Sequence, residues 1–389
     1  MINFNKIDPE IIQKVTAEKE SAESIDCVVF LSSFYKTKEI LKGECVVVTE
    51  YPFISALGVK LPKKEVFRLS NFSAVTYISK QSSVFAQVNV SKEIMGIENF
   101  YKEGICGENI SIAVIDTGIS RHLDFCFPKN KIIKFVDLIN NIKTPYDDNG
   151  HGTFVSSIIC GSGISSGYKY SGIAPKANIV SIKALEKNGE TGAFKILEAM
   201  QWVYDNHKKY NIKVVCMSFG SSPTSNNDPL MLGAEALWNS GIVVVAAAGN
   251  SGPESKTIKS PGISGKIITV GGFDDKREDG KFNENNFSVA DFSSRGPAGY
   301  FYKPDLVAPA VNIVGANLKG GYVKMSGTSV STPMVAGIAC LLLDKDKKLT
   351  PNQVKSVILK SCKKISNNKN IDGFGYINFK TIKIYWKQC

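Results

Sequence analysis

The chain has 389 residues, a formal charge of +11, nine cysteines and three histidines. Its length suggests about two or three domains, and 43% hydrophobic with 21% charged residues excludes a disordered or fibrous protein. No apolar run approaches the roughly 18 residues that span a bilayer, so we expect no membrane insertion.

The positive charge is concentrated at the C-terminal end. Residues 341–389 contain 11 basic and 3 acidic residues, whereas residues 1–85 contain 11 basic and 10 acidic ones. No recognition helix or basic stretch with interleaved aromatic residues accompanies this surplus. We therefore expect a solvated lysine-rich tail and no nucleic-acid partner; binding to nucleic acid or another anionic surface is the alternative.

The N-terminus and the cysteines bear on the compartment. The first 26 residues mix acidic and basic side chains without the apolar segment of a secretory signal, which predicts a cytoplasmic protein, with non-classical export as the alternative. The cysteines are odd in number, and the two closest, Cys27 and Cys45, are eighteen residues apart. That spacing fits neither a CxxC metal site nor a disulfide framework, so we expect packed, reduced thiols.

Short apolar runs alternate with polar turns in the first 85 residues, after a polar segment that predicts an N-terminal helix. The expected strands are Cys27–Ser32, Glu44–Glu50, Val66–Leu69 and Val75–Ile78. This pattern predicts a small α+β domain that ends near residue 85.

From residue 110 onward, continuous apolar runs alternate with helical segments. The runs are Ile110–Ile115, Ile179–Ala184, Val214–Met217, Ile242–Ala247 and Ile267–Val270, and the helical segments are Ala193–His207 and Pro229–Ser240. Continuous apolar runs are typical of buried parallel strands. We expect a doubly wound, mostly parallel α/β sheet that binds ligands beyond the carboxyl ends of its strands.

Two candidate catalytic residues follow from their positions. Asp116 ends an apolar run, which places a carboxylate at the binding edge of the sheet, where it could orient an imidazole; a turn aspartate is the alternative. His151 stands between two glycines and before an apolar run that predicts a helix. Histidine is the usual acid-base group at neutral pH, and a solvent-facing turn histidine is the alternative. His122 and His207 are expected on the surface.

Two further polar residues are candidates. Ser329 precedes Met334–Leu343, which is apolar all round and predicts a buried helix. We expect Pro333 in the first turn of this helix, which places Ser329 at or near the N-terminus. There it is either an N-cap or a nucleophile whose oxyanion faces free N–H groups. Asn250 follows another expected strand and either completes an oxyanion hole or is a turn residue.

The order Asp, His, Asn, Ser resembles that of one family, the subtilisin-like serine peptidases. The motifs that match its signatures are Asp116-Thr117-Gly118, His151-Gly152-Thr153 and Gly327-Thr328-Ser329-x-x-x-Pro333. The resemblance covers most of residues 86–380 and looks closest to intracellular-type bacterial subtilisins. It implies a serine endopeptidase in which Ser329 attacks the peptide carbonyl, His151 transfers the proton and Asp116 orients the imidazole.

The resemblance also implies how a protein or peptide substrate binds. Asn250 would donate to the oxyanion, and substrate would add as a strand. The residues implied in substrate binding are Ser218, Phe219, Gly220, Ala247, Ala248, Gly249 and Lys259. Relatives carry a small residue in place of Lys259. We expect its stem to line a mostly apolar pocket with the ammonium outside; a preference for acidic side chains is the alternative.

Residues 1–85 resemble the prodomain of the family, an intramolecular chaperone that also inhibits by occupying the cleft, and 86–389 resemble the peptidase domain. Phe85 and Ala86 match the processing site, so self-cleavage between them is expected; a domain that stays attached is the alternative. For the whole chain, the alternative to an active enzyme is a catalytically silent relative that binds peptides or partners.

We expect no required cofactor and no metal site. Asp124 matches a position that ligates calcium in some relatives. The loop Gly161–Ser171, however, is rich in glycine and serine and lacks the ligands of a strong calcium site. The sequence therefore leaves a structural calcium ion open without supporting it.

Overall fold

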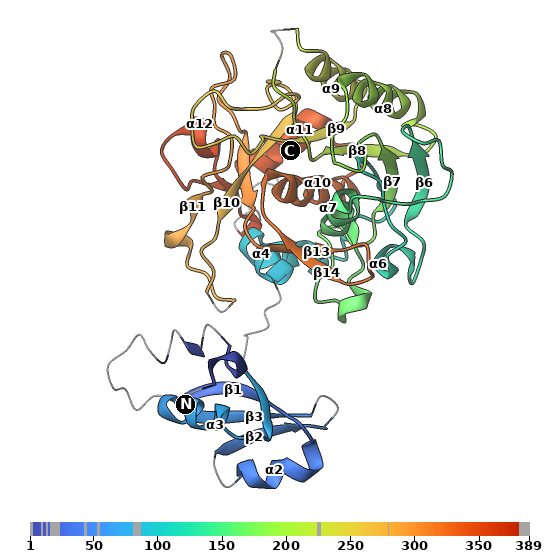
Figure 1. Cartoon of the computed structure of the whole chain (residues 1–389). Helices are drawn as coiled ribbons and strands as arrows, with labels where there is room; N and C mark the ends of the chain where they lie inside the picture. The colour runs from blue at the N-terminus through green and yellow to red at the C-terminus, as the bar shows by residue number, and fades with distance from the viewer. Residues whose placement is uncertain are drawn as a thin grey trace. The chain divides into compact units, whose positions relative to one another are not determined.

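The computed structural model describes residues 3–8, 11–12, 15, 24–42, 45–52, 55–80, 87–223, 227–278 and 280–380. The chain divides into two compact units, Met1–Val84 and Phe85–Cys389 (Figure 1). Each unit has its own cluster of buried apolar side chains. The eight cysteines within the described ranges are free thiols.

Among its described residues, the first unit contains a four-stranded antiparallel sheet and the helices α2 and α3, as expected of a small α+β domain. The strand order is β2 (Val46–Tyr51), β3 (Ala56–Pro62), β1 (Ser24–Leu31), β4 (Val75–Lys80), and the other elements are η1 (Phe4–Lys6), α2 (Phe34–Lys42) and α3 (Lys63–Ser70). Side chains such as Val29, Leu57 and Ile78 are fully buried between the sheet and the helices.

Some local predictions for the first unit are wrong. The expected strand Val66–Leu69 lies in α3, where Val66 and Leu69 are three residues apart and share the buried face of a helix. A run of four residues is too short to distinguish the 3.6-residue period of a helix from the two-residue period of a strand. The sequence does not predict β3 or α2, and most of the expected N-terminal helix lies outside the described residues.

The second unit is built on a ten-stranded sheet. Its order is β15-β16-β12-β10-β9-β8-β5-β7-β6, with β11 paired to β10; all neighbours along the path are parallel except β15 and β16. The strands are β5 (Ser111–Asp116), β6 (Ile132–Asp137), β7 (Asn178–Lys183), β8 (Ile212–Met217), β9 (Val243–Ala247), β10 (Ile268–Asp274), β11 (Ser288–Val289), β12 (Leu306–Pro309), β15 (Cys362–Lys363) and β16 (Tyr376–Ile377).

Helices cover both faces of this sheet, which confirms the doubly wound α/β class (Figure 1). On one face α7 (His151–Cys160) packs on β5 and on α10 (Thr328–Lys345), which crosses β8 to β12. On the other face α8 (Ala193–Asn206) and α9 (Pro229–Asn239) pack together. No helix in the described ranges is long and apolar enough to cross a membrane.

The remaining elements are shorter or peripheral. They are α4 (Gln87–Met95), α5 (Glu98–Lys102), α6 (Leu123–Cys126), η3 (Ile164–Ser166), η4 (Glu284–Asn286), the hairpin β13 (Ile313–Ala316) and β14 (Tyr322–Met325), α11 (Pro351–Lys360) and α12 (Lys369–Asp372). The five continuous apolar runs are confirmed as β5, β7, β8, β9 and β10. The sequence misses β6 because this edge strand is only partly buried.

Helix α10 is the buried central helix that the sequence predicts, but Pro333 lies inside it rather than in its first turn. Because proline has no N–H, the carbonyl of Ser329 lacks the donor that position 333 would otherwise supply. The hydroxyls of Ser331 and Thr332 donate to the carbonyl of Thr328 at 3.0 and 2.7 Å and so close the first turn.

His122 is buried, contrary to its expected surface position. Its Nδ1 accepts the N–H of Asp124 at 3.2 Å and caps helix α6, and the ring packs beside Phe125 and Tyr322. A histidine that serves as a helix cap leaves no periodic signal in a sequence, which explains the error. His207 is half-buried at the end of α8.

Candidate active site

Asp116 is the last residue of β5 and lies at the ligand-binding edge of the sheet. Strand β5 lies between β8 and β7, and the chain continues from it to β6 on one side and later crosses to β8 on the other. The Asp116 side chain is buried, and its Oδ1 accepts the N–H of Thr117 at 2.7 Å. The carboxylate of Asp116 therefore lies at the topological switch point, where the chain changes the side of β5 on which it adds strands.

His151 begins α7, and its Nδ1 lies 2.8 Å from Oδ1 and 3.0 Å from Oδ2 of Asp116. The preceding Gly150 has φ +107°, which lets the loop turn directly into the helix. Burial lowers the pKa of His151, but the charge and hydrogen bond of Asp116 and the charge of Asp147 outweigh burial and raise it above 6.5. This carboxylate can hold the ring with Nε2 available to accept a proton.

The loop before His151 is fixed by the carboxylate of Asp147. Its Oδ1 accepts the hydroxyl of Thr117 and the N–H groups of Asn149 and Gly150, while Oδ2 accepts the N–H and hydroxyl of Thr153. Burial raises the pKa of Asp147, but the hydrogen bonds from Thr153, Gly150 and Asn149 outweigh burial, so the pKa lies below its ordinary value. Asp147 therefore ties the start of α7 to the residue that follows Asp116.

Two glycines let the catalytic segments approach each other. A Cβ on Gly152 would lie 2.2 Å from the carbonyl oxygen of Gly118, and a Cβ on Gly118 would lie 2.2 Å from that of Tyr146. Gly118 also has φ +123°, which other residues rarely adopt. Both signature motifs thus need glycine because the backbones are in direct contact.

Ser329 and Asn250 face the same small space in front of Gly327. A Cβ on Gly327 would lie 3.2 Å from Nδ2 of Asn250 and 3.3 Å from Oγ of Ser329. Thr328 fixes the amide of Asn250, because both its N–H and its hydroxyl donate to Oδ1, at 2.8 and 2.9 Å. The same hydroxyl accepts the N–H of Gly249 at 3.2 Å. The Asn250 Nδ2 donor and the hydroxyl of Ser329 therefore both border the space beside Gly327.

The predicted substrate-binding segments follow neighbouring strands. Residues 218–220 follow β8, Ala247 ends β9 and residues 248–249 follow it, and these two strands are paired in the sheet. Ser218, Ala247 and Ala248 are buried, Phe219 is half-buried and Gly220 is exposed. Gly249 has φ +105°. The sheet thus brings the two segments to one edge.

The stem of Lys259 lies between these segments. A Cβ on Gly220 would lie 2.6 Å from Cβ of Lys259, and a Cβ on Gly249 would lie 2.4 Å from its Cγ. The N–H of Lys259 donates to the carbonyl of Ala248 at 2.9 Å, and its Nζ donates to Oγ of Ser222 at 3.2 Å near the surface. Methylene groups therefore face both glycines, and the charge lies beyond them.

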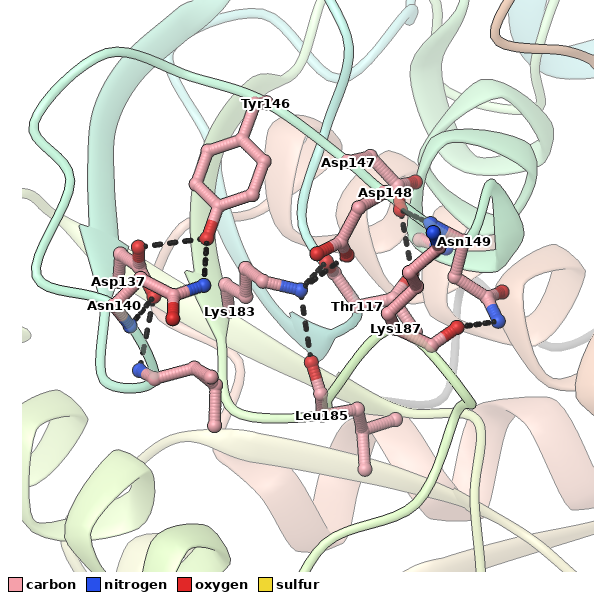
Figure 2. Close-up of polar contacts among 12 residues, drawn as sticks. Thr117, Asp137, Asn140, Tyr146, Asp147, Asp148, Asn149, Lys183, Leu185 and Lys187 are labelled. Carbon is pink, nitrogen blue, oxygen red and sulfur yellow. Dashed lines mark hydrogen bonds and ion pairs between the residues drawn. The ribbon is translucent and has the colours of Figure 1, made fainter.

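The sequence analysis does not find a cluster of charged side chains that lies beside Asp116 and the loop before His151. Asp147, Asp148 and the buried Lys183 connect the loop before His151 to the turn after Asp116 (Figure 2). A lysine inside the apolar run Ile179–Ala184 was the available signal. The proposed processing residues, Phe85 and Ala86, lie outside the described residues.

Asp124 does not fit a calcium site in this structure. Its Oδ1 accepts the N–H of Ser165 at 3.0 Å and its Oδ2 accepts the hydroxyl of Tyr322 at 2.7 Å, so donors approach both carboxylate oxygens. Calcium needs six to eight oxygen ligands. Among the described residues no group of three His, Cys, Asp or Glu side chains could hold a metal ion.

The fold and this site define a subtilisin-like serine peptidase, and the chain belongs to the subtilase family, whose sequence model matches residues 107–376. It is 37% identical over 335 residues to the serine protease AprX of Bacillus subtilis (strain 168), which covers 80% of this chain and 74% of AprX. It is 31% identical over 314 residues to the thermostable alkaline protease of Halalkalibacterium halodurans, an alignment that covers 80% of this chain and 79% of that protease.

Solved structures agree with these relatives. The structure of sphericase aligns with a TM-score of 0.62 and 28% identity, covering 73% of this chain and 97% of sphericase. The structure of S41 psychrophilic protease aligns with a TM-score of 0.63 and 28% identity over the same shares of each chain. The protein is therefore a serine-type peptidase, a hydrolase that acts on proteins or peptides.

Proposed function

We propose that peptide bonds are hydrolysed by Ser329, His151 and Asp116 through an acyl-enzyme. Ser329 Oγ attacks the carbonyl carbon while His151 Nε2 takes its proton, and His151 then gives that proton to the leaving amine. Water, deprotonated by His151, next attacks the ester carbon and releases the acid and the free serine. The observation that carries this proposal is the contact of His151 Nδ1 with both oxygens of Asp116.

Two donors would stabilise the oxyanion that forms at each attack. The side chain of Asn250 is one, because Thr328 holds its Oδ1 while Nδ2 borders the same space beside Gly327 as Ser329 Oγ. The backbone N–H of Ser329 is the other, since the first turn of α10 offers it no helical acceptor. Preorganised donors of this kind supply a large share of catalysis in acyl transfer.

Substrate would bind as an added strand along residues 218–220, with the side chain before the scissile bond between residues 218–220 and 247–249. The Lys259 stem makes this pocket apolar, and its ammonium lies near Ser222 outside it. We expect faster hydrolysis after Phe or Leu than after Glu. A peptide library decides this, and a preference for Glu that disappears in Lys259→Met would contradict it.

A fluorophosphonate probe tests the reaction mechanism, because it forms a covalent bond only with an activated serine. We expect the wild-type protein to be labelled and Ser329→Ala not to be. Ser240, whose hydroxyl donates to the carbonyl of Leu237 at the end of α9, offers a matched control in Ser240→Ala. If the wild type is unlabelled with residues 1–85 removed, the alternative of a catalytically silent, peptide-binding relative is favoured.

We also propose that the first unit is a prodomain that assists folding, inhibits the cleft and is removed by self-cleavage between Phe85 and Ala86. Its separate buried core supports an independently folding unit. Mass spectrometry of purified protein should find a chain beginning at Ala86 for the wild type and an intact chain for Ser329→Ala. An intact wild-type chain with full activity would contradict processing.

A further inference from the structure

Lys183 is a fully buried lysine at the end of β7, and no step of the proposed reaction uses it. It pairs in register with Asp116 on the neighbouring strand. The backbone that follows it is bound to the same residue, because the N–H groups of Ala184 and Leu185 donate to the carbonyl of Asp116 at 3.0 and 3.2 Å. Lys183 therefore begins its side chain beside the catalytic carboxylate.

The ammonium of Lys183 contacts three segments at once (Figure 2). Nζ donates to the carbonyl of Thr117 at 2.7 Å, to Oδ1 of Asp148 at 2.7 Å and to the carbonyl of Leu185 at 3.0 Å. It also lies 5.3 Å from the centre of the Tyr146 ring, a cation–π contact. Its three hydrogens are thus matched by three acceptors.

These contacts join the two halves of the acid-base pair. Thr117 follows Asp116 directly, and Asp148 lies three residues before His151. Asp147 makes a second link between the same segments through the hydroxyl of Thr117. The Lys183 link differs because it carries a buried charge: without Asp148, the ammonium would keep only two neutral carbonyls and the ring.

We propose that Lys183 and Asp148 are positioning residues that fix the loop before His151 against the turn after Asp116, so that Nδ1 of His151 meets the carboxylate. The inference rests on the proposed function. A positioning pair acts on the chemical step more than on substrate binding, since misplacing a catalytic group by about 1 Å can cost about 10²-fold in rate. Its loss should therefore lower kcat and leave KM nearly unchanged.

The test compares the full chains of Lys183→Met and Asp148→Asn with the wild type. Steady-state kinetics on a chromogenic peptide are measured well below the unfolding temperature of each variant, and the folded fraction is measured by circular dichroism. We expect kcat to fall about 10- to 100-fold in Lys183→Met and about 3- to 10-fold in Asp148→Asn, with KM within about twofold. Asp148 is partly exposed, and asparagine has nearly the same shape as aspartate. Asp148→Asn therefore still tests the positioning role if Lys183→Met fails to fold.

Lys303→Met is the matched control. Lys303 is also a buried lysine that binds a backbone carbonyl and a carboxylate, but it lies between β10 and β12 and contacts neither catalytic segment. Its loss should lower thermal stability with less than about a twofold change in kcat.

The following results would overturn the inference or the proposed function. Equal kcat per folded molecule in wild type and Asp148→Asn, or an equal fall in Lys303→Met, would overturn the inference. A change confined to KM would overturn it too. Wild-type protein without Ser329-dependent turnover would refute the proposed function itself, whereas normal wild-type turnover with unchanged variants would refute only the role of Lys183.

Discussion

The segments that carry Asp116 and His151 are held by many contacts, whereas the Asn250 amide is held by one threonine. Asp147 alone accepts five hydrogen bonds around the acid-base pair. Near Ser329, the N–H and the hydroxyl of Thr328 both donate to Oδ1 of Asn250 and so orient its amide. The difference teaches that losing one contact should disturb the nucleophile side more than the acid-base side.

The largest expected effect comes from removing the negative charge of Asp116. In Asp116→Asn the neutral amide would hold His151 in the wrong tautomer, so kcat should fall about 10⁴-fold, a magnitude carried over from another serine protease. Steady-state kinetics of the folded variant measure it. A loss of less than about tenfold would mean that the many contacts around Asp147, and not Asp116, set the state of the imidazole.

The next largest effect concerns the oxyanion donor. Asn250→Leu removes Nδ2 while keeping the size of the side chain, so kcat should fall about 10²- to 10³-fold with little change in KM. That magnitude was established on a subtilisin, a member of this family, and is carried over rather than derived. An unchanged kcat would exclude Asn250 from the oxyanion hole.

A pair of threonine variants tests the comparison itself. Thr328→Val removes one of two donors to Asn250 Oδ1, and we expect kcat to fall about tenfold. Thr117→Val removes one of five donors to Asp147 and the acceptor of the Gly152 N–H, just as Thr328→Val removes the acceptor of the Gly249 N–H, and we expect a change of less than about threefold. Equal losses, measured on the same peptide at the same folded fraction, would show that the two sides are held equally well.

The smallest effect is a shift in pH dependence. The proposed base must be neutral, and the charge and hydrogen bond of Asp116 raise the pKa of His151 over the effect of burial, so kcat/KM should fall as the pH drops, with a midpoint above that of an ordinary histidine. Because the charge of Asp147 helps to raise this pKa, Asp147→Asn should move the midpoint to lower pH. A midpoint that moves upward would contradict this account of the electrostatics.

The sequence predicts those parts of the site that lie on regular elements. Asp116 follows a continuous apolar run, and Ser329 precedes a segment that is apolar all round, so both positions follow from burial alone. The pairing of His151 with Asp116 follows from the resemblance, since their contact joins residues that are 35 positions apart.

The sequence does not predict the supporting contacts. Thr117 and Asp147 lie 30 positions apart and meet only because β5 and the loop before α7 reach the same edge of the sheet. Lys183 sits in an apolar strand, where a lysine gives no sign of which acceptors it will find. Such contacts depend on the arrangement of whole elements, which local patterns do not encode.

Pro333 has a consequence for how the serine moves during a reaction cycle. The carbonyl of Ser329 receives no N–H from the residue four positions on, so the helical ladder of α10 is interrupted at the nucleophile. In the proposed reaction, in which the serine becomes part of a tetrahedral centre and then of an ester, its peptide group would adjust without stretching a helical hydrogen bond. The helix would then hold the proposed nucleophile at a point where its own hydrogen-bond ladder is already open.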